Sequence, residues 1–318
     1  MDLTYTNANR VDQGVLAAYV FDLSFGAAEN DFEITMGIDD PLLEFGSVVY
    51  IEGTEYGGMV DGIKSSTNGK TITYKGRTWH GTMNSKVIQP DSGKDYLIVS
   101  GDANEILSML IARLGLSELF VAAEYASGIS VKDYQFTRYC KGYDGIRAML
   151  ESANAKLKVV WKDRSVHLSA VPIVDYTAAP VDRDIATLKV EQNQHKVNHL
   201  ICLGKGELAA RKVIHLYVDQ FGRISETQYY TGIDEITETY DNPNTDNLKS
   251  DGLLALGAMR ISDKAEITIS ETEGLSYDIG DIVGATEYRS GVIVAETVTQ
   301  KIVKINNGVV STDYKTGG

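Results

Sequence analysis

The sequence has 318 residues, enough for two or three domains. Hydrophobic residues make up 43% and charged residues 23%, which excludes a fibre and a fully disordered chain. The formal net charge is −14: acids outnumber bases 14 to 7 in residues 1–100 and 21 to 14 in residues 181–318, whereas residues 101–180 carry 9 of each. The basic surface of a nucleic-acid-binding protein is therefore missing, because acidic surfaces repel a phosphate backbone.

Two cysteines, Cys140 and Cys202, offer no disulfide framework, and we expect two free thiols in a reducing cytoplasm. The N-terminus lacks the basic start and apolar core of a secretion signal. No run approaches 18 apolar residues, so the sequence predicts no membrane segment and a chain that is made and folded in a cytoplasm.

The first hundred residues are expected to form strands. Residues 31–36 alternate strictly between polar and apolar side chains, which is typical of a strand with one buried face. The dipeptide Asn68-Gly69 separates residues 63–67 from residues 70–74. Because Asn-Gly readily adopts the positive φ angles of a type I′ turn, this segment predicts a β-hairpin.

The middle of the chain combines helices with a hairpin. Apolar residues at helical spacing predict a helix that begins after Asp102, whose side chain can cap it, and that ends at Gly115. A second helix is expected over residues 144–153. Residues 156–161 and 165–170 are expected to form a hairpin.

The last part of the chain returns to strands from Ala186 onward. One helix is expected at about residues 246–260, and another Asn-Gly hairpin is expected at Asn307-Gly308. The buried face of that helix is expected to consist of Leu248, Ala255, Leu256 and Met259.

These elements predict a mainly β fold with an α+β insert, in which two β-barrel or sandwich domains flank a mixed region. The first β-domain is expected at residues 1–100 and the α+β domain at residues 101–182. The second β-domain, with its one helix, is expected at residues 183–318.

The two β-rich ends share a pattern in the same order. Both contain a Gly-x-x-Val run, a Thr-Glu-Tyr triplet, an isoleucine five residues before Asn-Gly, and a Tyr-Lys pair that precedes a glycine. The members are Gly46, Thr54–Tyr56, Ile63, Asn68-Gly69 and Tyr74–Gly76 in the first copy, and Gly280, Thr286–Tyr288, Ile302, Asn307-Gly308 and Tyr314–Gly317 in the second. Either short hairpins converged on one pattern, or the chain holds two copies of one small β-domain. Two similar domains per chain would allow a closed trimer with near six-fold symmetry, suited to docking on a hexameric tube.

The most distinctive segment is Gly76-Arg77-Thr78-Trp79-His80-Gly81. Arginine, tryptophan and histidine all have catalytic uses, so an active-site segment is one interpretation. In a strand, however, Arg77, Trp79 and Gly81 share one face, where the guanidinium can stack on the indole. Gly76 and Gly81 would then mark bends or a close approach of backbones. We favour this structural interpretation.

Other candidate sites have incomplete patterns. His195 and His199 are spaced like two zinc ligands on a helix, but the stretch resembles a strand and no third ligand is evident. Residues 204–206 lack the spacing of a phosphate loop, and residues 241–246 lack the glycine and glutamate of a calcium loop. Cys140 lies beside bases that would lower its pKa, but no histidine partner can be assigned. We therefore predict no catalytic, cofactor or metal site, although a carboxylate pair could be hidden among the many acids.

The Gly76–Gly81 segment, followed by Lys86-Val87-Ile88, resembles siphophage tail proteins that are related to the baseplate hub. Further stretches agree in order over nearly the whole chain: Leu97–Asn104, Phe136–Tyr139, Val197–Leu208, Ile279–Val283 and Tyr314–Gly317. The resemblance implies a homotrimeric tail hub at the distal end of the tail tube, in which two tube-like β-domains per subunit form a pseudo-hexameric ring.

The same resemblance implies the partners: further copies of the chain, the tail tube or distal tail protein, a spike or tail-tip protein, and the tape-measure protein. DNA would pass through a central channel without specific binding, and an acidic wall would let it slide. The protein would reside in the virion tail after assembly in the host cytoplasm. Some relatives carry a peptidoglycan-cleaving domain after the hub. Because this chain ends at Gly318, we expect no such domain and no enzymatic activity.

Two other functions stay open at this point. A tail-associated cell-wall hydrolase or peptidase would use carboxylates or Cys140, and a peptidoglycan-release assay would reveal it. A receptor- or carbohydrate-binding module would use some of the 18 tyrosines, although β-proteins use tyrosine generally.

Overall fold

The computed structural model describes residues 1–65, 69–178, 186–191, 196–220, 222–245, 247–260, 264–270, 276–286 and 293–317. The chain divides into two compact units: the first comprises Met1–Leu188 with Glu266–Gly318, and the second comprises Lys189–Ala265. Residues from all three expected domains lie in the first unit, because C-terminal strands pair with N-terminal ones. Within the described ranges, no helix combines the length and apolarity that crossing a bilayer requires.

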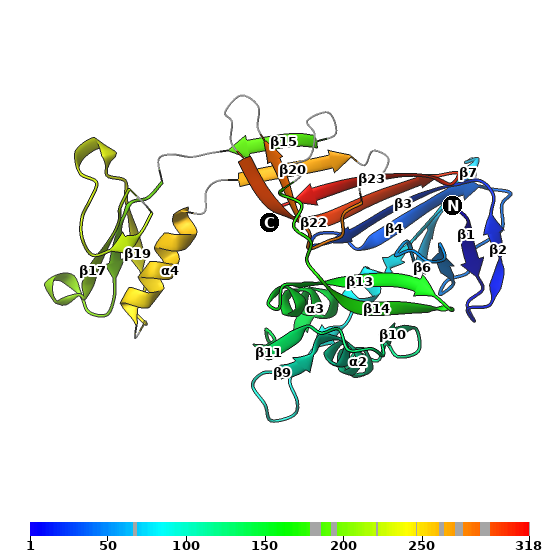
Figure 1. Cartoon of the computed structure of the whole chain (residues 1–318), viewed down its shortest axis with the longest axis horizontal. Helices are drawn as coiled ribbons and strands as arrows, with labels where there is room; N and C mark the ends of the chain where they lie inside the picture. Colours follow the sequence, from blue (N-terminus) through cyan, green and yellow to red (C-terminus); the bar gives the residue numbers. More distant parts are fainter. Residues whose placement is uncertain are drawn as a thin grey trace. The chain divides into compact units, whose positions relative to one another are not determined.

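The first unit is built on a twelve-stranded sheet, and the expectation of a mainly β fold with some helix is confirmed (Figure 1). Its order is β15-β20-β23-β22-β3-β4-β7-β6-β5-β1-β2, and β21 pairs with β22 off this path. The strands are β1 (Leu3–Thr6), β2 (Asp12–Leu16), β3 (Tyr19–Gly26), β4 (Asp31–Gly37), β5 (Val48–Tyr50), β6 (Gly57–Lys64), β7 (Thr71–Thr78), β15 (Ala186–Glu191), β20 (Lys264–Ser270), β21 (Ile282–Thr286), β22 (Ile293–Asn306) and β23 (Val309–Thr316).

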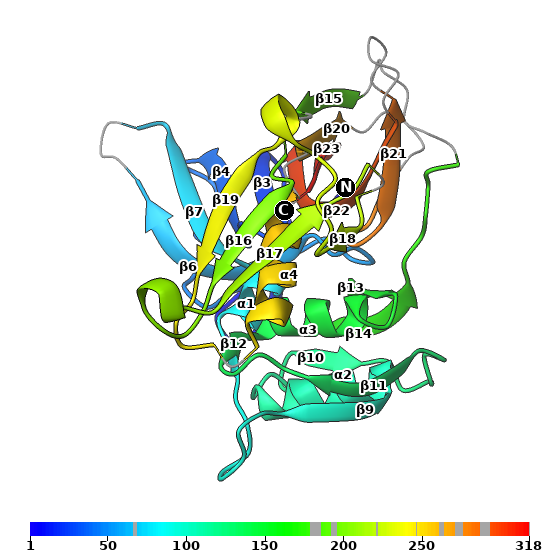
Figure 2. The same ribbon diagram turned by 90° about the vertical axis from the view of Figure 1, so that its left-hand side faces the viewer.

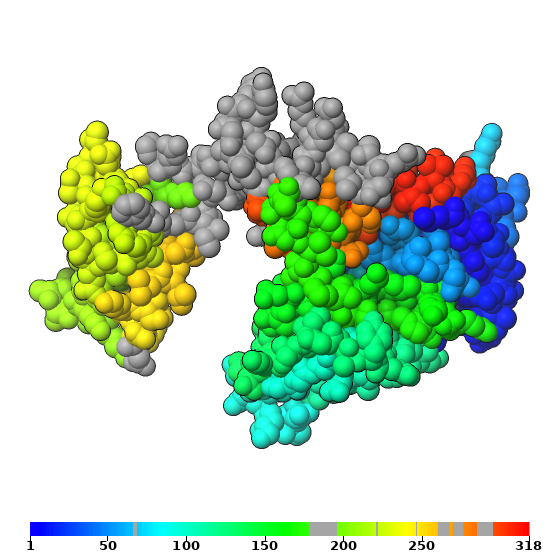
Figure 3. Space-filling view, viewed as in Figure 1, coloured from blue at the N-terminus to red at the C-terminus, as the bar shows by residue number. Residues whose placement is uncertain are grey.

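Alternating side chains bury one face of this sheet. In β4, Phe32, Ile34 and Met36 are buried and Asp31 and Glu33 are exposed, so the predicted strand is confirmed. The apolar core extends from β1 across the sheet into β22, and it includes Leu3, Phe21, Leu23, Phe25, Val49, Val60, Tyr74, Val303 and Ile305. Segments from opposite ends of the sequence therefore share one core. The blue N-terminal strands and the red C-terminal hairpin lie side by side on the surface in Figure 3.

The middle of the chain packs against the sheet as an α+β layer (Figure 1). Both predicted helices are confirmed. Asp102 caps the first by accepting a hydrogen bond from the Asn104 amide, and Gly115 ends it with a φ of 68°. The predicted hairpin is β13 paired with β14. The elements are α1 (Trp79–Asn84), β8 (Val87–Ile88), β9 (Ile98–Asp102), α2 (Ala103–Arg113), β10 (Phe120–Ala122), β11 (Ser130–Gln135), β12 (Cys140–Lys141), α3 (Gly142–Glu151), β13 (Ala155–Lys162) and β14 (Ser165–Pro172).

The second unit is a four-stranded sheet, β18-β17-β16-β19, with helix α4 packed on one face (Figure 2). Its elements are β16 (His199–Leu203), η1 (Leu208–Ala210), β17 (Val213–Val218), β18 (Ile224–Ser225), η2 (Gly232–Asp234), β19 (Thr237–Asp241) and α4 (Leu248–Arg260). The helix contacts the sheet through Leu248, Gly252 and Leu256, which lie four residues apart. Met259 lies off this stripe and is 36% exposed, so its predicted burial is wrong.

Gly76 lies where neighbouring residues of the main sheet leave no room for a side chain. A Cβ atom at this position would lie 2.0 Å from the Met59 carbonyl oxygen and 2.6 Å from the Phe32 ring. We expect Gly76→Ala to lower the free energy of unfolding by about 3 kcal/mol, measured in urea by tryptophan fluorescence. Gly62→Ala is the matched control, because its Cβ would meet only Lys75, at an ordinary 3.9 Å. Similar losses for the two variants would contradict this account of the packing.

Candidate assembly surface

The Gly76–Gly81 segment changes conformation at Thr78, where strand β7 ends and helix α1 begins. The Thr78 side chain caps the helix by accepting a hydrogen bond from the Gly81 amide at 3.2 Å. The predicted strand is therefore wrong from Trp79 onward, and so is the predicted stacking of Arg77 on the indole. Arg77 instead forms an ion pair with Asp61 at 2.7 Å.

The aromatic residues of this segment belong to the core. Trp79 is fully buried and stacks on Trp161 of β13, with ring centroids 5.0 Å apart. Gly81 lies so close to the loop between β3 and β4 that a Cβ atom would come within 2.0 Å of the Asn30 carbonyl oxygen. The segment therefore attaches the α+β layer to the main sheet by packing.

His80 is also buried, with its ring stacked on Phe25 at 4.5 Å and against the edge of Tyr143 at 5.0 Å. Its Nε2 atom lies 3.9 Å from Glu55. That geometry would suit an ion pair, but burial, with a further contribution from the charge of Lys301, lowers the pKa of His80 to about 3. The imidazole is therefore neutral at physiological pH.

The C-terminal Asn-Gly pair forms the predicted hairpin. Asn307 and Gly308 have φ angles of 48° and 84° and join β22 to β23. The Met1 amino group donates a hydrogen bond to the Gly308 carbonyl at 3.1 Å. The first pair cannot be compared fully, since Asn68 lies outside the described residues, while Gly69 lies two residues before the start of β7.

The sequence repeat corresponds to a repeat in three dimensions. In the first copy, the Gly46 amide donates to the Val60 carbonyl at 2.8 Å, and the Val60 amide donates to the Ser47 carbonyl at 2.9 Å. In the second, Gly280, Val298 and Asp281 make the same two bonds, both at 2.8 Å. Short hairpins that had merely converged would have no reason to reproduce these contacts between distant residues.

Each copy also contains the same tyrosine contact. The Tyr74 hydroxyl accepts a hydrogen bond from the Leu43 amide at 3.2 Å, and the Tyr314 hydroxyl accepts one from the Tyr277 amide at 3.3 Å. Leu43 precedes Gly46 by three residues, as Tyr277 precedes Gly280. Buried amides that would otherwise lack a partner are thus satisfied in the same way twice.

The strand register defines which residues correspond. Both hairpins have a register shift, after Val60 in β6 and after Val298 in β22, and both then pair with the strand that carries the tyrosine. Ile63 lies opposite Tyr74, and Lys301 lies opposite Tyr314. The counterpart of Ile63 is therefore Lys301, and the match of Ile63 with Ile302 in the sequence pattern is wrong by one residue.

Five strands correspond in this way: β3, β4, β7, β6 and β5 of the first copy match β15, β20, β23, β22 and β21 of the second. The two copies meet where β22 pairs with β3, from Gln300 opposite Gly26 to Asn306 opposite Val20. We call this contact the internal joint.

The equivalent edge of the first copy is open. Residues 62–64 of β6 pair with β7 on one side, and Asp61 lies at the register shift. No strand among the described residues pairs with the other side of residues 61–64. At the far end of the sheet order lies β15, the counterpart of β3. We call residues 61–64 the open edge. Ile63 is 46% exposed there, whereas its counterpart Lys301 is 3% exposed in the internal joint.

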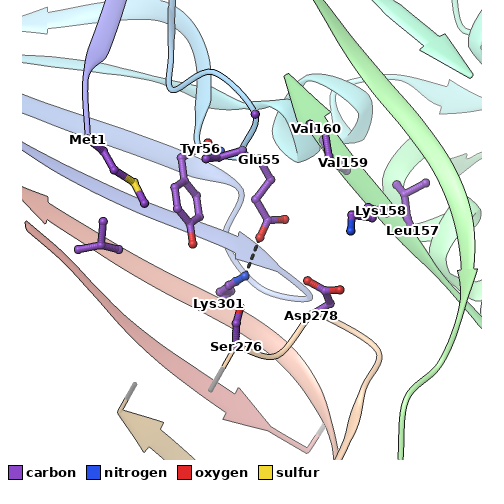
Figure 4. A pocket seen from close by; sticks show the side chains of 13 residues that line it. Met1, Glu55, Tyr56, Leu157, Lys158, Val159, Val160, Ser276, Asp278 and Lys301 are labelled. Atoms are coloured by element: carbon purple, nitrogen blue, oxygen red, sulfur yellow. Dashed lines mark hydrogen bonds and ion pairs between the residues drawn. The ribbon is translucent and has the colours of Figure 1, made fainter. Parts of the chain in front are cut away.

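A buried ion pair marks the internal joint (Figure 4). The Lys301 ammonium lies 2.6 Å from Glu55, and the Tyr56 and Tyr314 rings lie within 6 Å, at 5.8 and 5.5 Å. Burial alone would lower the pKa of Lys301, but Glu55 and the two tyrosines outweigh it, so the pKa lies above its ordinary value. The lysine is therefore charged, and its partner comes from the other copy.

A cavity of about 370 Å³ lies beside this pair, between the two copies and strand β13 (Figure 4). At its margin, Lys156 contacts Asp281 at 2.6 Å and Asp278 at 2.9 Å. Lys301 already has its counter-ion, and the cavity lining holds no cysteine or histidine. The Lys156 side chain thus joins β13 to the second copy of the repeat.

The remaining candidates do not assemble a catalytic set in the part of the chain that is described. Burial raises the pKa of Cys140, so the lowering expected from neighbouring bases is wrong. No group of three or more histidine, cysteine or acidic residues could hold a metal ion among these residues. His195, half of the predicted zinc pair, lies outside them.

No protein-family model and no curated protein sequence matches this chain significantly. Solved structures match along its whole length. The 43 kDa tail protein of prophage MuSo2 from Shewanella oneidensis is 11% identical with a TM-score of 0.57, over 100% of this chain and 98% of that one. Prophage tail protein gp18 from Listeria monocytogenes EGD-e is 12% identical with a TM-score of 0.54, over 100% and 95%. A chain of the phage P2 baseplate in its activated conformation with Ca is 11% identical with a TM-score of 0.55, over 100% and 99%.

At these identities the similarity is one of fold. The chain has the fold of prophage tail and phage baseplate proteins, and the resemblance expected from the sequence is confirmed at that level.

Lys301→Ala should lower the free energy of unfolding by about 3 kcal/mol, because it leaves the Glu55 carboxylate without its counter-ion in a largely buried position. Lys304→Ala on the same strand is the matched control. Its ion pair with Asp22 is exposed on both sides, and we expect a loss below about 1 kcal/mol. Urea titrations followed by tryptophan fluorescence measure both, and equal losses would refute a special role for the buried pair.

His80 should make folding sensitive to acid. The unfolded chain takes up a proton near the ordinary histidine pKa of about 6.5, whereas folded His80 does so only near pH 3. Stability is therefore lost as the pH falls through this window, by at most about 1.4 kcal/mol per pH unit. His80→Phe keeps a stacking ring and should show a smaller loss between pH 7 and pH 4.5. Parallel stability–pH curves for variant and wild type would count against this assignment.

Proposed function

We propose that this protein is a non-enzymatic structural component of a phage-type tail, and that three chains close into a ring of six similar β-domains. The observation that carries the proposal is the contrast between the internal joint and the open edge. Within one chain, a β6-type strand, β22, takes a β3-type strand as its neighbour. The open edge of β6 presents the same type of surface without that neighbour.

The missing neighbour is present at the other end of the sheet. β15 is the β3-type strand of the second copy, and it forms the end of the strand order. If β15 of one chain pairs with the open edge of the next, the contact between chains repeats the contact inside each chain. Such a head-to-tail contact forms a ring when its rotation closes. The pseudo-hexameric tail hubs that the sequence resembles imply closure after three chains.

The exposure of Ile63 supports this pairing. An isoleucine at the end of an exposed strand edge is an aggregation risk in a monomer, because unpaired backbone groups and apolar side chains recruit other strands. Its counterpart Lys301 becomes almost fully buried when the internal joint forms. We infer that Ile63 is buried likewise when a neighbouring chain docks.

The face of the main sheet opposite the apolar core would line the channel. Charges on this face are paired across strands: Asp22 with Lys304, Glu33 with Lys75, and Asp61 with Arg77. We propose this mixed wall in place of a purely acidic one. Because charges of both signs alternate there, a phosphate backbone would find no continuous basic track to bind. DNA and the tape-measure protein would then pass without specific contacts.

The fold of the similar tail and baseplate proteins supports a location in the virion tail, with the ring between the tail tube and a spike or tail-tip protein. The alternative of a cell-wall hydrolase or peptidase predicts peptidoglycan release by the purified chain. Our proposal predicts none.

Ile63→Asp should abolish the trimer, because it places a charge at the edge where the next chain would dock. Sedimentation velocity of the wild type at high concentration should show a species of three subunit masses, and electron microscopy should show three-fold rings. The variant should sediment as a folded monomer, since Ile63 is already half-exposed within one chain.

Val309→Asp is the matched control, since Val309 is 73% exposed and lies at the β22–β23 turn, away from the open edge. It should leave the trimer intact. A wild-type chain that stays monomeric and binds neither tube nor spike proteins would refute the proposal, and so would an Ile63→Asp variant that still forms rings.

A further inference from the structure

The second unit contains a row of ionisable side chains that the proposed ring does not use. His199 of β16 and His215 of β17 lie on adjacent antiparallel strands, with His199 Nε2 only 2.8 Å from His215 Nδ1. On the other side of its imidazole, His199 Nδ1 lies 2.5 Å from a carboxylate oxygen of Glu235 and 3.2 Å from the Thr237 hydroxyl. Two imidazoles and one carboxylate thus form a continuous chain.

The positions of the protons follow from these distances. Glu235 is an acceptor when ionised, so His199 Nδ1 carries the proton that it donates. His199 Nε2 is then the unprotonated nitrogen, and His215 Nδ1 donates to it across the 2.8 Å contact. One proton therefore lies between two imidazole nitrogens, at a point where each could offer a lone pair to a cation.

His199 is buried, and the His215 ring beside it is exposed. Helix α4 covers the face of the sheet that carries Leu200, Cys202 and Leu216. His199 and His215 lie on the opposite face, where His215 is exposed and the Tyr217 ring stacks on His199 at 4.3 Å. Figure 2 shows β16 and β17 side by side with α4 on one side only. Glu235, from the segment between η2 and β19, also lies against His199 on this face.

We propose that His199 Nε2 and His215 Nδ1 bind a divalent transition-metal ion, with zinc as the representative. The ion replaces the shared proton, and neutral His215 then carries its proton on Nε2 instead of Nδ1. Two nitrogen ligands at zinc bond lengths in tetrahedral geometry lie about 3.3 Å apart. The nitrogens need to separate by about half an ångström from their present 2.8 Å, and each ring turns so that its lone pair points at the ion, which lies beside the line between the two nitrogens.

Glu235 is the observation that favours a metal over a simple hydrogen bond. Histidines that bind metals usually donate their second ring N–H to a carboxylate, a backbone carbonyl or water, which fixes the tautomer and raises the basicity of the coordinating nitrogen. His199 already has this arrangement. Imidazole nitrogens also select zinc or copper over magnesium and calcium, which prefer oxygen ligands.

The site has two protein ligands, in keeping with the finding that the described residues hold no group of three. Water or a donor from another molecule would complete the coordination. The ion is therefore exchangeable, and the fold of the unit does not depend on it. The site also differs from the predicted pair, since it joins His199 to His215 on a neighbouring strand rather than to His195.

Calorimetric titration of the chelator-treated full chain with zinc chloride tests the proposal. We expect one zinc ion per chain, no binding of magnesium under the same conditions, and loss of zinc binding in His199→Gln and in His215→Gln. Glu235→Gln should weaken binding by about 10- to 100-fold without removing a ligand. Cobalt substitution gives an independent readout, because its visible spectrum reports nitrogen coordination.

Two further histidine variants serve as controls. His167→Gln, on β14 of the first unit, and His195→Gln should bind zinc like the wild type. Circular dichroism and thermal unfolding without metal distinguish a lost ligand from a lost fold. Zinc binding that persists in the His215 variant, or that disappears in the His195 variant, would overturn the proposal. Neither result bears on the trimer, which depends on the first unit.

Discussion

The pairing of β22 with β3 is the contact on which the rest of the first unit depends. It joins residues about 280 positions apart in the sequence. Closing so long a loop costs conformational entropy, and the burial of apolar side chains at this contact must offset that cost. That burial is substantial, since Val303 and Ile305 enter the same core as Phe21 and Leu23. The two copies of the repeat become one sheet through this contact. Strand β13 is joined to the second copy by the ion pair of Lys156 with Asp281, and to the first copy by backbone hydrogen bonds of Trp161 with Gly53 and Thr54.

The two copies share the contacts that satisfy buried backbone amides. They differ in the side chains at positions whose neighbours differ. The tyrosine contact and the register shift occur in both, because each copy must satisfy the same buried amide. Lys301 and Ile63 occupy equivalent positions but have different chemistry. A buried lysine requires a permanent counter-ion, which Glu55 supplies within the chain. An isoleucine carries no charge and needs no counter-ion, so Ile63 tolerates its exposure in the single chain.

The second unit has a different physical character. Its small core lies under α4 on one face of the sheet, and the other face carries polar and aromatic side chains. On that second face the exposed His215 ring lies next to the buried His199 ring. In our proposals the first unit carries the assembly contacts, and the second unit binds a metal ion at His199 and His215.

Local patterns in the sequence were enough to predict the local structure. Alternation predicted β4, the capping pattern at Asp102 predicted α2, and the Asn-Gly dipeptide predicted the β22–β23 hairpin. These succeed because their causes lie within a few residues of one another. The order of the repeat motifs was also visible, but the equivalence of Ile63 with Lys301 was not, since pairing register is determined by strands that are distant in the sequence.

The sequence by itself determined the mainly β fold class and the strongest strands and helices, because these follow from composition and periodicity. Its motifs also carried the resemblance to tail proteins, but they left open whether the two ends are a true repeat, which the equivalent hydrogen bonds of the two copies decided. Only the tertiary structure decided that β7 ends at Thr78, that Arg77 pairs with Asp61, that Lys301 is buried against Glu55, and that His199 faces His215. The three side-chain contacts join residues of separate elements, which only the packing of those elements brings together.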